Sequence, residues 1–321
     1  MRNASTVIRK PEPILIDTDT GVDDALAILY AMHSPEVRVE AITTVAGNVE
    51  VEKCTRNART ILGYAGTSYR PEVVQGSGKP LRLPLITAPE VHGDDGLGNT
   101  QSLNTGKTRG QSLDAVECIR RLCAQRHGQL TIVAIGPLTN IALALAMHPR
   151  SLRKVKRIVS MGGAFRVPGN TGPVAEFNYF VDPHAANAVL HAGLPLTVVP
   201  LDVTEQIILT RNHLRNIVRE GPSRLTSFVY KFTGLYMRYH RKTLGINGGY
   251  LHDPLAMAIA ILPSLARLQR VHVEVECKSP LTRGMTVADL RRKGKRTDPE
   301  VVVDFDRDKF LELFQRRVLA Y

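Results

Sequence analysis

The feature that most constrains the fold of this chain is a short apolar segment that leads directly into acidic residues and then into an apolar helical pattern. Residues 14–16 have the composition of a buried parallel strand, and the helical spacing of apolar residues begins at Ala25. The carboxylates between them are Asp17, Asp19, Asp23 and Asp24. Asp17 and Asp19 are therefore expected at the carboxyl end of a strand, the edge where ligands bind in an open α/β sheet.

Carboxylates this close together repel one another, and in a partly dry crevice the repulsion costs several kcal/mol. Either some of the acids hold protons, or a bound cation neutralises them. A hard divalent cation takes carboxylate, carbonyl and water oxygens as ligands. Because the stretch lacks cysteine and its nearest histidine is His33 on the following helix, the residue types favour Ca²⁺ or Mg²⁺ over zinc.

Two other interpretations of this stretch are open. A capping box from Thr20 to Asp23 at the helix start explains Asp23 and Asp24, but it does not explain the acidic pair at the strand end. Residues 17–20, Asp-Thr-Asp-Thr, also match the nucleophile motif of haloacid-dehalogenase-like phosphatases, which hold a divalent metal. Those phosphatases need a further acidic pair late in the chain, and no convincing pair is present there.

Residues 17–25, Asp-Thr-Asp-Thr-Gly-Val-Asp-Asp-Ala, resemble the DxDxGxDDA signature of the inosine-uridine-preferring nucleoside hydrolases. Residues 92–97, His-Gly-Asp-Asp-Gly-Leu, are similar to a segment that lines the active site in that family. The N-x5-E-x-N spacing over residues 170–178 and the His-Asp-Pro of residues 252–254 also match. The resemblance runs from about residue 12 to the end of the chain.

The resemblance implies an enzyme that hydrolyses the N-glycosidic bond of ribonucleosides to ribose and a free purine or pyrimidine base. It implies Ca²⁺ as the cofactor, with Asp19 also serving as the base that takes the proton of the attacking water. The metal ligands that it implies are Asp19, Asp24, Asp253 and the main-chain carbonyl of Ile135. On the residues alone, Asp253 has an alternative role as an ordinary helix N-cap, and a backbone ligand leaves no side-chain signature.

The family pattern also assigns groups that bind substrate and supply the proton. An asparagine at a strand end is either a turn residue or a ligand, and the pattern sets Asn48 beside the nucleophilic water. His252 is the first candidate acid for the leaving base, His92 the second and His240 a weaker third. The residues expected to hold the nucleoside are Asp23, Met161, Asn170, Glu176, Asn178, Tyr236 and His240.

The rest of the chain predicts an open, mostly parallel, Rossmann-like α/β sheet with helices on both faces and the active site at the carboxyl ends of the strands. Further strands are expected at residues 37–45, 71–75, 130–135, 157–160, 196–200, 271–276 and 301–305. Helices are expected at 51–64, 112–127, 141–147, 182–191, 211–244 with a break at 221–222, 253–262 and from 308. Residues 76–111 form a long irregular excursion. One domain is expected over residues 1–321, with 1–11 as a loosely ordered tail.

Net charge and composition limit which partners and which cellular compartment are expected. The net charge of +12 permits a non-catalytic nucleic-acid or ribose-binding protein, but the dense basic stretches at 150–157 and 291–296 lack interleaved aromatics. We therefore expect no specific nucleic acid partner, and no membrane partner, since no apolar run reaches about 18 residues. The four cysteines form no CxxC pair, which favours buried free thiols, and we expect a cytoplasmic protein. The family resemblance implies a homo-oligomer, dimer or tetramer.

Overall fold

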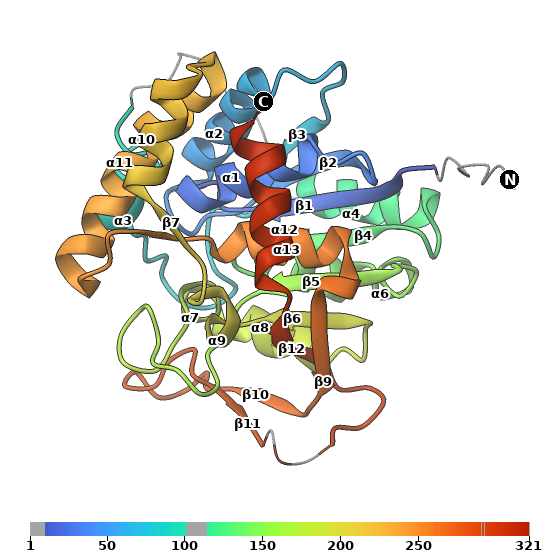
Figure 1. Cartoon of the computed structure of the whole chain (residues 1–321). Helices are drawn as coiled ribbons and strands as arrows, with labels where there is room; N and C mark the ends of the chain where they lie inside the picture. The colour runs from blue at the N-terminus through green and yellow to red at the C-terminus, as the bar shows by residue number, and fades with distance from the viewer. Residues whose placement is uncertain (1–9, 101–113, 290, 292, 321) are drawn as a thin grey trace, which may run out of the picture.

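The computed structural model describes residues 10–100, 114–289, 291 and 293–320, and its centre is an eight-stranded sheet (Figure 1). Neighbouring strands are parallel except at one edge, where the last pair is antiparallel. In order across the sheet, the strands are β3 (Glu72–Gln75), β2 (Val37–Thr44), β1 (Glu12–Thr18), β4 (Thr131–Ala134), β5 (Arg157–Met161), β6 (Leu196–Val199), β12 (Glu300–Phe305) and β9 (Ala266–Arg270). The predicted open, mostly parallel α/β sheet is confirmed.

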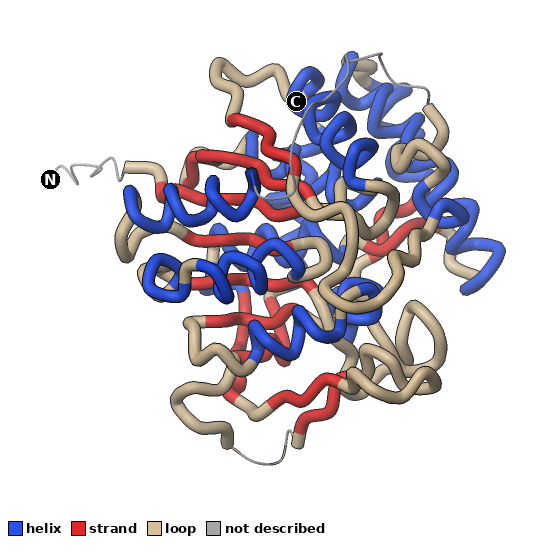
Figure 2. Tube along the Cα trace, turned by 180° about the vertical axis from the view of Figure 1, so that it is seen from behind, coloured by secondary structure: helices blue, strands red, loops and turns tan. Residues whose placement is uncertain are grey.

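The central strands are buried on both faces, because helices cover each side of the sheet (Figures 1 and 2). Ile14 and Ile16 of β1 pack into the core on one face, and Leu15 packs into the core on the other. The first core is covered by α1 (Val22–Met32), α2 (Val51–Tyr64), α12 (His252–Ile261) and α13 (Arg307–Phe314). The second is covered by α4 (Asp114–Gln125), α5 (Thr139–Met147) and α8 (Pro183–Leu190).

The remaining elements lie outside the central sheet and the helices named above. Two long helices, α10 (Arg211–Glu220) and α11 (Arg224–Leu244), lie next to each other at one side of the molecule (Figure 1). Two short antiparallel strand pairs join β7 (Ile208–Thr210) to β8 (Gly248–Tyr250), across α10 and α11 in the sequence, and β10 (Val273–Val275) to β11 (Thr286–Ala288), which form a hairpin. The short helices are α3 (Pro89–His92), α6 (Pro149–Leu152), α7 (Phe177–Val181) and α9 (Leu201–Thr204), with a 3₁₀ turn at Pro263–Leu265 and a π-helical turn at Gln315–Leu319.

Register brings the ends of the central strands together. Asp17 of β1 lies opposite Thr43 of β2 and Ala134 of β4. Just beyond, the N–H of Ile135 donates to the carbonyl of Asp17 at 2.8 Å. The turns that follow β1, β2 and β4 therefore meet at the same edge of the sheet.

The structure differs from the expected elements in several places. The helix α1 begins at Val22, before the apolar pattern that starts at Ala25, so its first turn carries Asp23 and Asp24. Residues 271–276 do not join the main sheet, because β10 pairs only with β11 among the described strands. The antiparallel edge strand β9 was not expected, because only Ala266 and Leu268 alternate with polar residues in its sequence, and Leu268 is exposed. The excursion from residue 76 contains the helix α3, and its later part, from 101, lies outside the described residues.

Other expectations can be compared with the described residues only in part. Most of the expected tail, residues 1–9, lies outside them, and the single-domain organisation stays a prediction. All four cysteines carry free thiols; Cys54, Cys118 and Cys123 are buried, whereas Cys277 is partly exposed. Among the described residues, no helix combines the length and the apolar composition that crossing a bilayer requires.

Candidate active site

A cavity of about 240 Å³ opens at the edge where the turns after β1, β2, β4 and β5 meet. All of the predicted site residues except Asp19 and Asp24 line it. They are Asp23, Asn48, His92, Ile135, Met161, Asn170, Glu176, Asn178, Tyr236, His240, His252 and Asp253. Residues spread over most of the chain are therefore brought to one cavity, as the sequence predicts.

Three carboxylates from two helices meet beside this cavity. Asp23 and Asp24 lie in the first turn of α1, and Asp253 lies in the first turn of α12, which packs against α1. One carboxylate oxygen from each lies within 4.8 Å of the others, and all three residues are buried. Since α12 is preceded by Leu251 as its N-cap, the alternative role of Asp253 as an ordinary N-cap is wrong.

Asp19 follows β1 directly, and its charge interacts with those of Asp24 and Asp253. Its Oδ2 accepts the N–H of Asn48 at 2.8 Å, whereas its Oδ1 is buried and has no hydrogen-bond partner among the described residues. A Cβ on Gly136 would lie 2.9 Å from that unpaired oxygen, so only glycine lets the turn after β4 approach it. Ile135, whose carbonyl is the implied main-chain ligand, is therefore adjacent to Asp19.

Burial and mutual repulsion raise the pKa values of these acids. Burial, followed by the negative charge of Asp24, raises the pKa of Asp23 to about 8 and the pKa of Asp19 well above its ordinary value. Burial and the charge of Asp23 likewise raise the pKa of Asp253. Without a counter-charge some of these carboxyls hold protons at neutral pH. An oxygen-only donor set with an unpaired buried oxygen fits a hard divalent cation, which would release those protons.

The purely structural interpretation of the acidic stretch accounts for only one residue. The predicted capping box ran from Thr20 to Asp23, but the helix N-cap is Gly21, whose N–H donates to Asp24 Oδ2 at 2.8 Å. Asp24 also accepts from Thr18 Oγ1 at 2.5 Å and from Asn48 Nδ2 at 3.0 Å. Capping therefore orients Asp24 and leaves the positions of the other acids unexplained.

Asp17 is buried behind the cluster and does not line the cavity. Its Oδ1 accepts from Thr43 Oγ1 at 2.5 Å and from Asn140 Nδ2 at 2.8 Å, which links β1, β2 and α5. Burial raises the pKa of Asp17 to about 6. These contacts agree with a supporting position behind the acids that reach the cavity.

The loop after β5 carries the predicted sugar-binding residues. Glu176 is the N-cap of α7 and accepts the N–H groups of Asn178, Tyr179 and Gly163, and burial raises its pKa to about 7. Asn178 Nδ2 donates to the carbonyls of Ile135 at 3.3 Å and Met161 at 3.2 Å. These bonds fix the loop and leave the second lone pair of each carbonyl for a ligand.

Asn170 is held in the same loop by its own side chain. Its Oδ1 accepts the N–H of Phe177 at 2.9 Å, which leaves the amide nitrogen available to a ligand in the cavity that Asn170 lines.

The histidines of the cavity are buried as neutral imidazoles. The Nδ1 of His92 accepts the N–H of Val22 at 3.1 Å, and burial lowers the pKa of His92 to about 3. The Nδ1 of His252 lies 2.7 Å from Thr204 Oγ1, and burial, with the nearby His240, lowers its pKa to about 3. Burial therefore favours the neutral imidazole in these histidines, because desolvation disfavours the charged form.

Several cavity residues were not predicted from the sequence. The ring of Tyr250, in the β7–β8 strand pair, lies 5.3 Å from that of His252. Glu205 follows α9, and burial, followed by the charge of Asp202, raises its pKa to about 7. The other unpredicted lining residues include Ile86, Thr87, Glu90, Tyr239, Thr243 and Leu244. None of them belongs to a motif.

Comparison with known proteins identifies the family. The family profile "Inosine-uridine preferring nucleoside hydrolase" matches residues 14–312. An inosine-uridine preferring nucleoside hydrolase of Leishmania major is 39% identical over 92% of this chain and 95% of its own length. A pyrimidine-specific ribonucleoside hydrolase of Shewanella is 40% identical over 96% of both chains.

Solved structures agree with the sequence comparisons. A plant nucleoside hydrolase superposes with a TM-score of 0.89 at 34% identity, covering 97% of this chain and 100% of its own. A purine-preferring ribonucleoside hydrolase from Gardnerella vaginalis superposes with a TM-score of 0.88 at 33% identity, covering 96% and 98%. The chain thus belongs to the inosine-uridine preferring nucleoside hydrolase family and is a ribonucleoside hydrolase, an enzyme that splits N-glycosyl bonds to give ribose and a free base.

Proposed function

We propose that this enzyme uses Ca²⁺ and that the ion is held by Asp19, Asp24, Asp253 and the carbonyl of Ile135. The observation that carries the proposal is the buried, unpaired Oδ1 of Asp19, close enough to the cluster of Asp23, Asp24 and Asp253 for the charges to interact. The donors are all oxygens, which suits a hard cation better than zinc. When bound, such an ion supplies a clamp for vicinal hydroxyls and lowers the pKa of a water.

The protein's own groups would then orient the sugar and move one proton. Asp19 accepts the proton of the attacking water, and Asn48, whose N–H holds the other oxygen of Asp19, lies beside it. Asp23 binds a ribose hydroxyl rather than the metal. Fixed carboxylates around the ribose favour the positive charge that develops on its ring as the bond breaks.

The loop after β5 would complete the sugar site. Asn170, Glu176 and Asn178, together with the main chain of Met161, bind the remaining ribose oxygens. Their support is the shared cavity and the network of hydrogen bonds that fixes the loop.

The leaving base needs a proton, and a neutral imidazole is the proposed donor. With the hydroxyl of Thr204 donating to Nδ1, His252 carries its own proton on Nε2 and can donate from there. His92 has the same tautomer, because its Nδ1 accepts from the main chain of Val22, and it is the second candidate. Tyr236 and His240, which lie one turn apart on α11, would contact the base itself.

One chromatographic assay tests the proposal. Purified protein is incubated with inosine, adenosine, uridine or cytidine, and free base is measured with and without a calcium-selective chelator. We expect release that stops with chelator and returns with Ca²⁺. Release that continues at full rate after complete chelation, or that returns with Mg²⁺ but not with Ca²⁺, would contradict the assigned ion.

Three coarser features of the proposal have separate tests. We infer a homo-oligomer from the family resemblance, a cytoplasmic location from the cysteine usage, and one domain because no obvious linker divides the sequence. Sedimentation velocity measures the mass of the assembly, cell fractionation the compartment, and limited proteolysis with calorimetry the number of cooperative units. A monomeric mass at micromolar concentration would contradict the first.

A further inference from the structure

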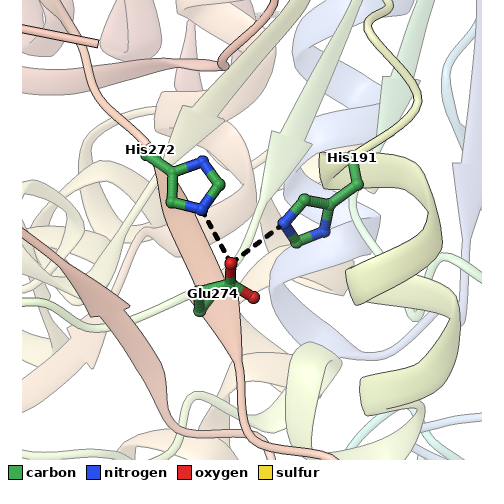
Figure 3. A group of neighbouring side chains, drawn as sticks. All are labelled: His191, His272 and Glu274. Carbon is green, nitrogen blue, oxygen red and sulfur yellow. Dashed lines mark hydrogen bonds and ion pairs between the residues drawn. The ribbon is translucent and has the colours of Figure 1, made fainter.

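Two histidines and a glutamate gather on the surface outside the active-site cavity (Figure 3). His191 directly follows α8, His272 precedes β10, and Glu274 lies within β10. We propose that these three residues form a second cation site, specific for a divalent transition metal such as Zn²⁺. The site is independent of the proposed function of the carboxylate cluster.

The spacing of the ligand atoms fits such an ion. His272 Nε2 lies 2.7 Å from Glu274 Oε1, and His191 Nε2 lies 3.4 Å from the same oxygen. All three ligand atoms lie within 4.8 Å of one another. In tetrahedral zinc sites, metal–ligand distances of about 2.0–2.2 Å set ligand atoms about 3.3–3.5 Å apart. Shifts of roughly 1 Å at exposed side-chain ends would therefore complete the site.

Both imidazoles are already turned with the correct nitrogen toward the centre. His191 Nδ1 donates to the carbonyl of Asn187 at 2.9 Å, and His272 Nδ1 donates to Asp298 Oδ1 at 3.1 Å. An acceptor on Nδ1 leaves the lone pair of Nε2 for a metal, and a carboxylate there strengthens the ligand. Two separate acceptors, one main-chain and one carboxylate, thus hold the two rings in one arrangement.

The donor set distinguishes this site from the carboxylate cluster. Imidazole nitrogens select Zn²⁺, Ni²⁺ or Cu²⁺, whereas oxygen-only sites select Ca²⁺ or Mg²⁺. Two imidazoles and one carboxylate leave a fourth position for water. The competing explanation is a metal-free ion pair, because the same carboxylates, Asp298 and Glu274, raise the pKa of His272.

A bound metal would join three segments that are distant in the sequence. It would tie the end of α8 to β10 and, through Asp298, to the segment before β12. The β10–β11 hairpin also contacts the active-site loop, since Thr286 Oγ1 donates to the carbonyl of Ala164 at 2.7 Å. We therefore assign the metal a structural role in fixing the hairpin.

The test is zinc titration of the untagged, full-length protein in millimolar Ca²⁺, which occupies the carboxylate cluster. Isothermal calorimetry would compare the wild type with His191→Gln, His272→Gln and Glu274→Gln. His213→Gln, an exposed histidine on α10, is the matched control. We expect one zinc per chain in the wild type and the control, and an affinity lower by about tenfold or more in each site variant.

X-ray absorption of the zinc-loaded protein supplies the direct readout. Two imidazole nitrogens at zinc in the wild type and one in His272→Gln support the proposal. Equal zinc affinity in the wild type and all three site variants overturns it, as does the absence of zinc binding below millimolar concentration. Loss of binding in Asp19→Ala but not in the site variants also overturns it, by assigning the zinc to the carboxylate cluster. Circular dichroism confirms that each variant is folded.

Discussion

The carboxylate cluster and the His191–His272–Glu274 cluster are two groups of potential metal ligands with opposite surroundings. The first is buried at the amino ends of two helices, and its acids have lost their hydration. The second lies on the surface, where each residue remains hydrated whether or not a metal binds. Burial makes a counter-charge necessary in the first cluster, whereas exposure makes the metal optional in the second.

This difference determines what each site can do to the molecule. Core packing of α1 against α12 holds the buried acids in position, so the site exists before the ion arrives. Electrostatic interactions are stronger in a preformed site from which water is excluded than in water, and such interactions stabilise a transition state. The surface cluster depends on side-chain ends, and its metal can fix neighbouring segments without changing the core.

The largest effect is expected from Asp19→Ala. The change removes both a proposed ligand and the proposed base, so kcat for inosine or uridine should fall by roughly 10³-fold or more, together with loss of bound Ca²⁺. Free-base release and metal content per chain are the measurements. Asp308→Ala, an exposed acid on α13 that does not line the cavity, is the control and should behave as the wild type. Near-normal kcat in Asp19→Ala would end the assignment.

The next effect concerns the proton given to the leaving base. His252→Ala should slow natural nucleosides by about 10²-fold, whereas p-nitrophenyl riboside, whose leaving group needs no proton, should be hydrolysed almost normally. Rates on both substrates are measured at saturating Ca²⁺. Equal slowing of the two would mean that His252 acts on the sugar or on the structure instead.

The apolar strand that ends at Asp17 predicted that Asp17 and Asp19 lie at the ligand-binding edge of the sheet. That Asp253 joins the acidic stretch was implied by the family resemblance and not by the pattern of elements, because an aspartate before a helix is also an ordinary N-cap. The charge state of the histidines was not predictable, because it depends on burial by α11 and the β7–β8 strand pair. Thr204 and Tyr250 were missed for the same reason: tertiary packing, and no motif, brings them to His252.

The sequence contains no motif that predicts the surface cluster. His191 ends one helix and His272 lies before a hairpin strand, with no short metal-binding spacing between them. The alternating valines of residues 271–276 predicted a strand of the main sheet, and β10 instead forms a separate hairpin against α8. That placement, which a local pattern cannot specify, is what brings Glu274 to both histidines.

When Ca²⁺ is removed, the buried acids should make the stability of the protein depend on pH. Burial raises the folded-state pKa of Asp23 to about 8 and that of Asp17 to about 6, above the ordinary carboxyl value of 3.8. The folded protein therefore holds protons more tightly than the unfolded chain, and its stability falls as pH rises from about 4 to 8. We expect Tm in chelator to drop over this range and saturating Ca²⁺ to flatten the decline. An identical decline with and without Ca²⁺ would contradict a cation among these acids.

The smallest effect is expected from His272→Gln in the absence of zinc. The residue is exposed, and its ion pairs with Glu274 and Asp298 are of the surface type, worth about 0–1 kcal/mol. Urea unfolding should therefore give nearly the wild-type free energy in chelator. Added zinc should raise the midpoint of the wild type alone, because a ligand of the native state stabilises it by mass action. A large loss of stability without zinc would instead make the ion pair, rather than the metal, the purpose of the cluster.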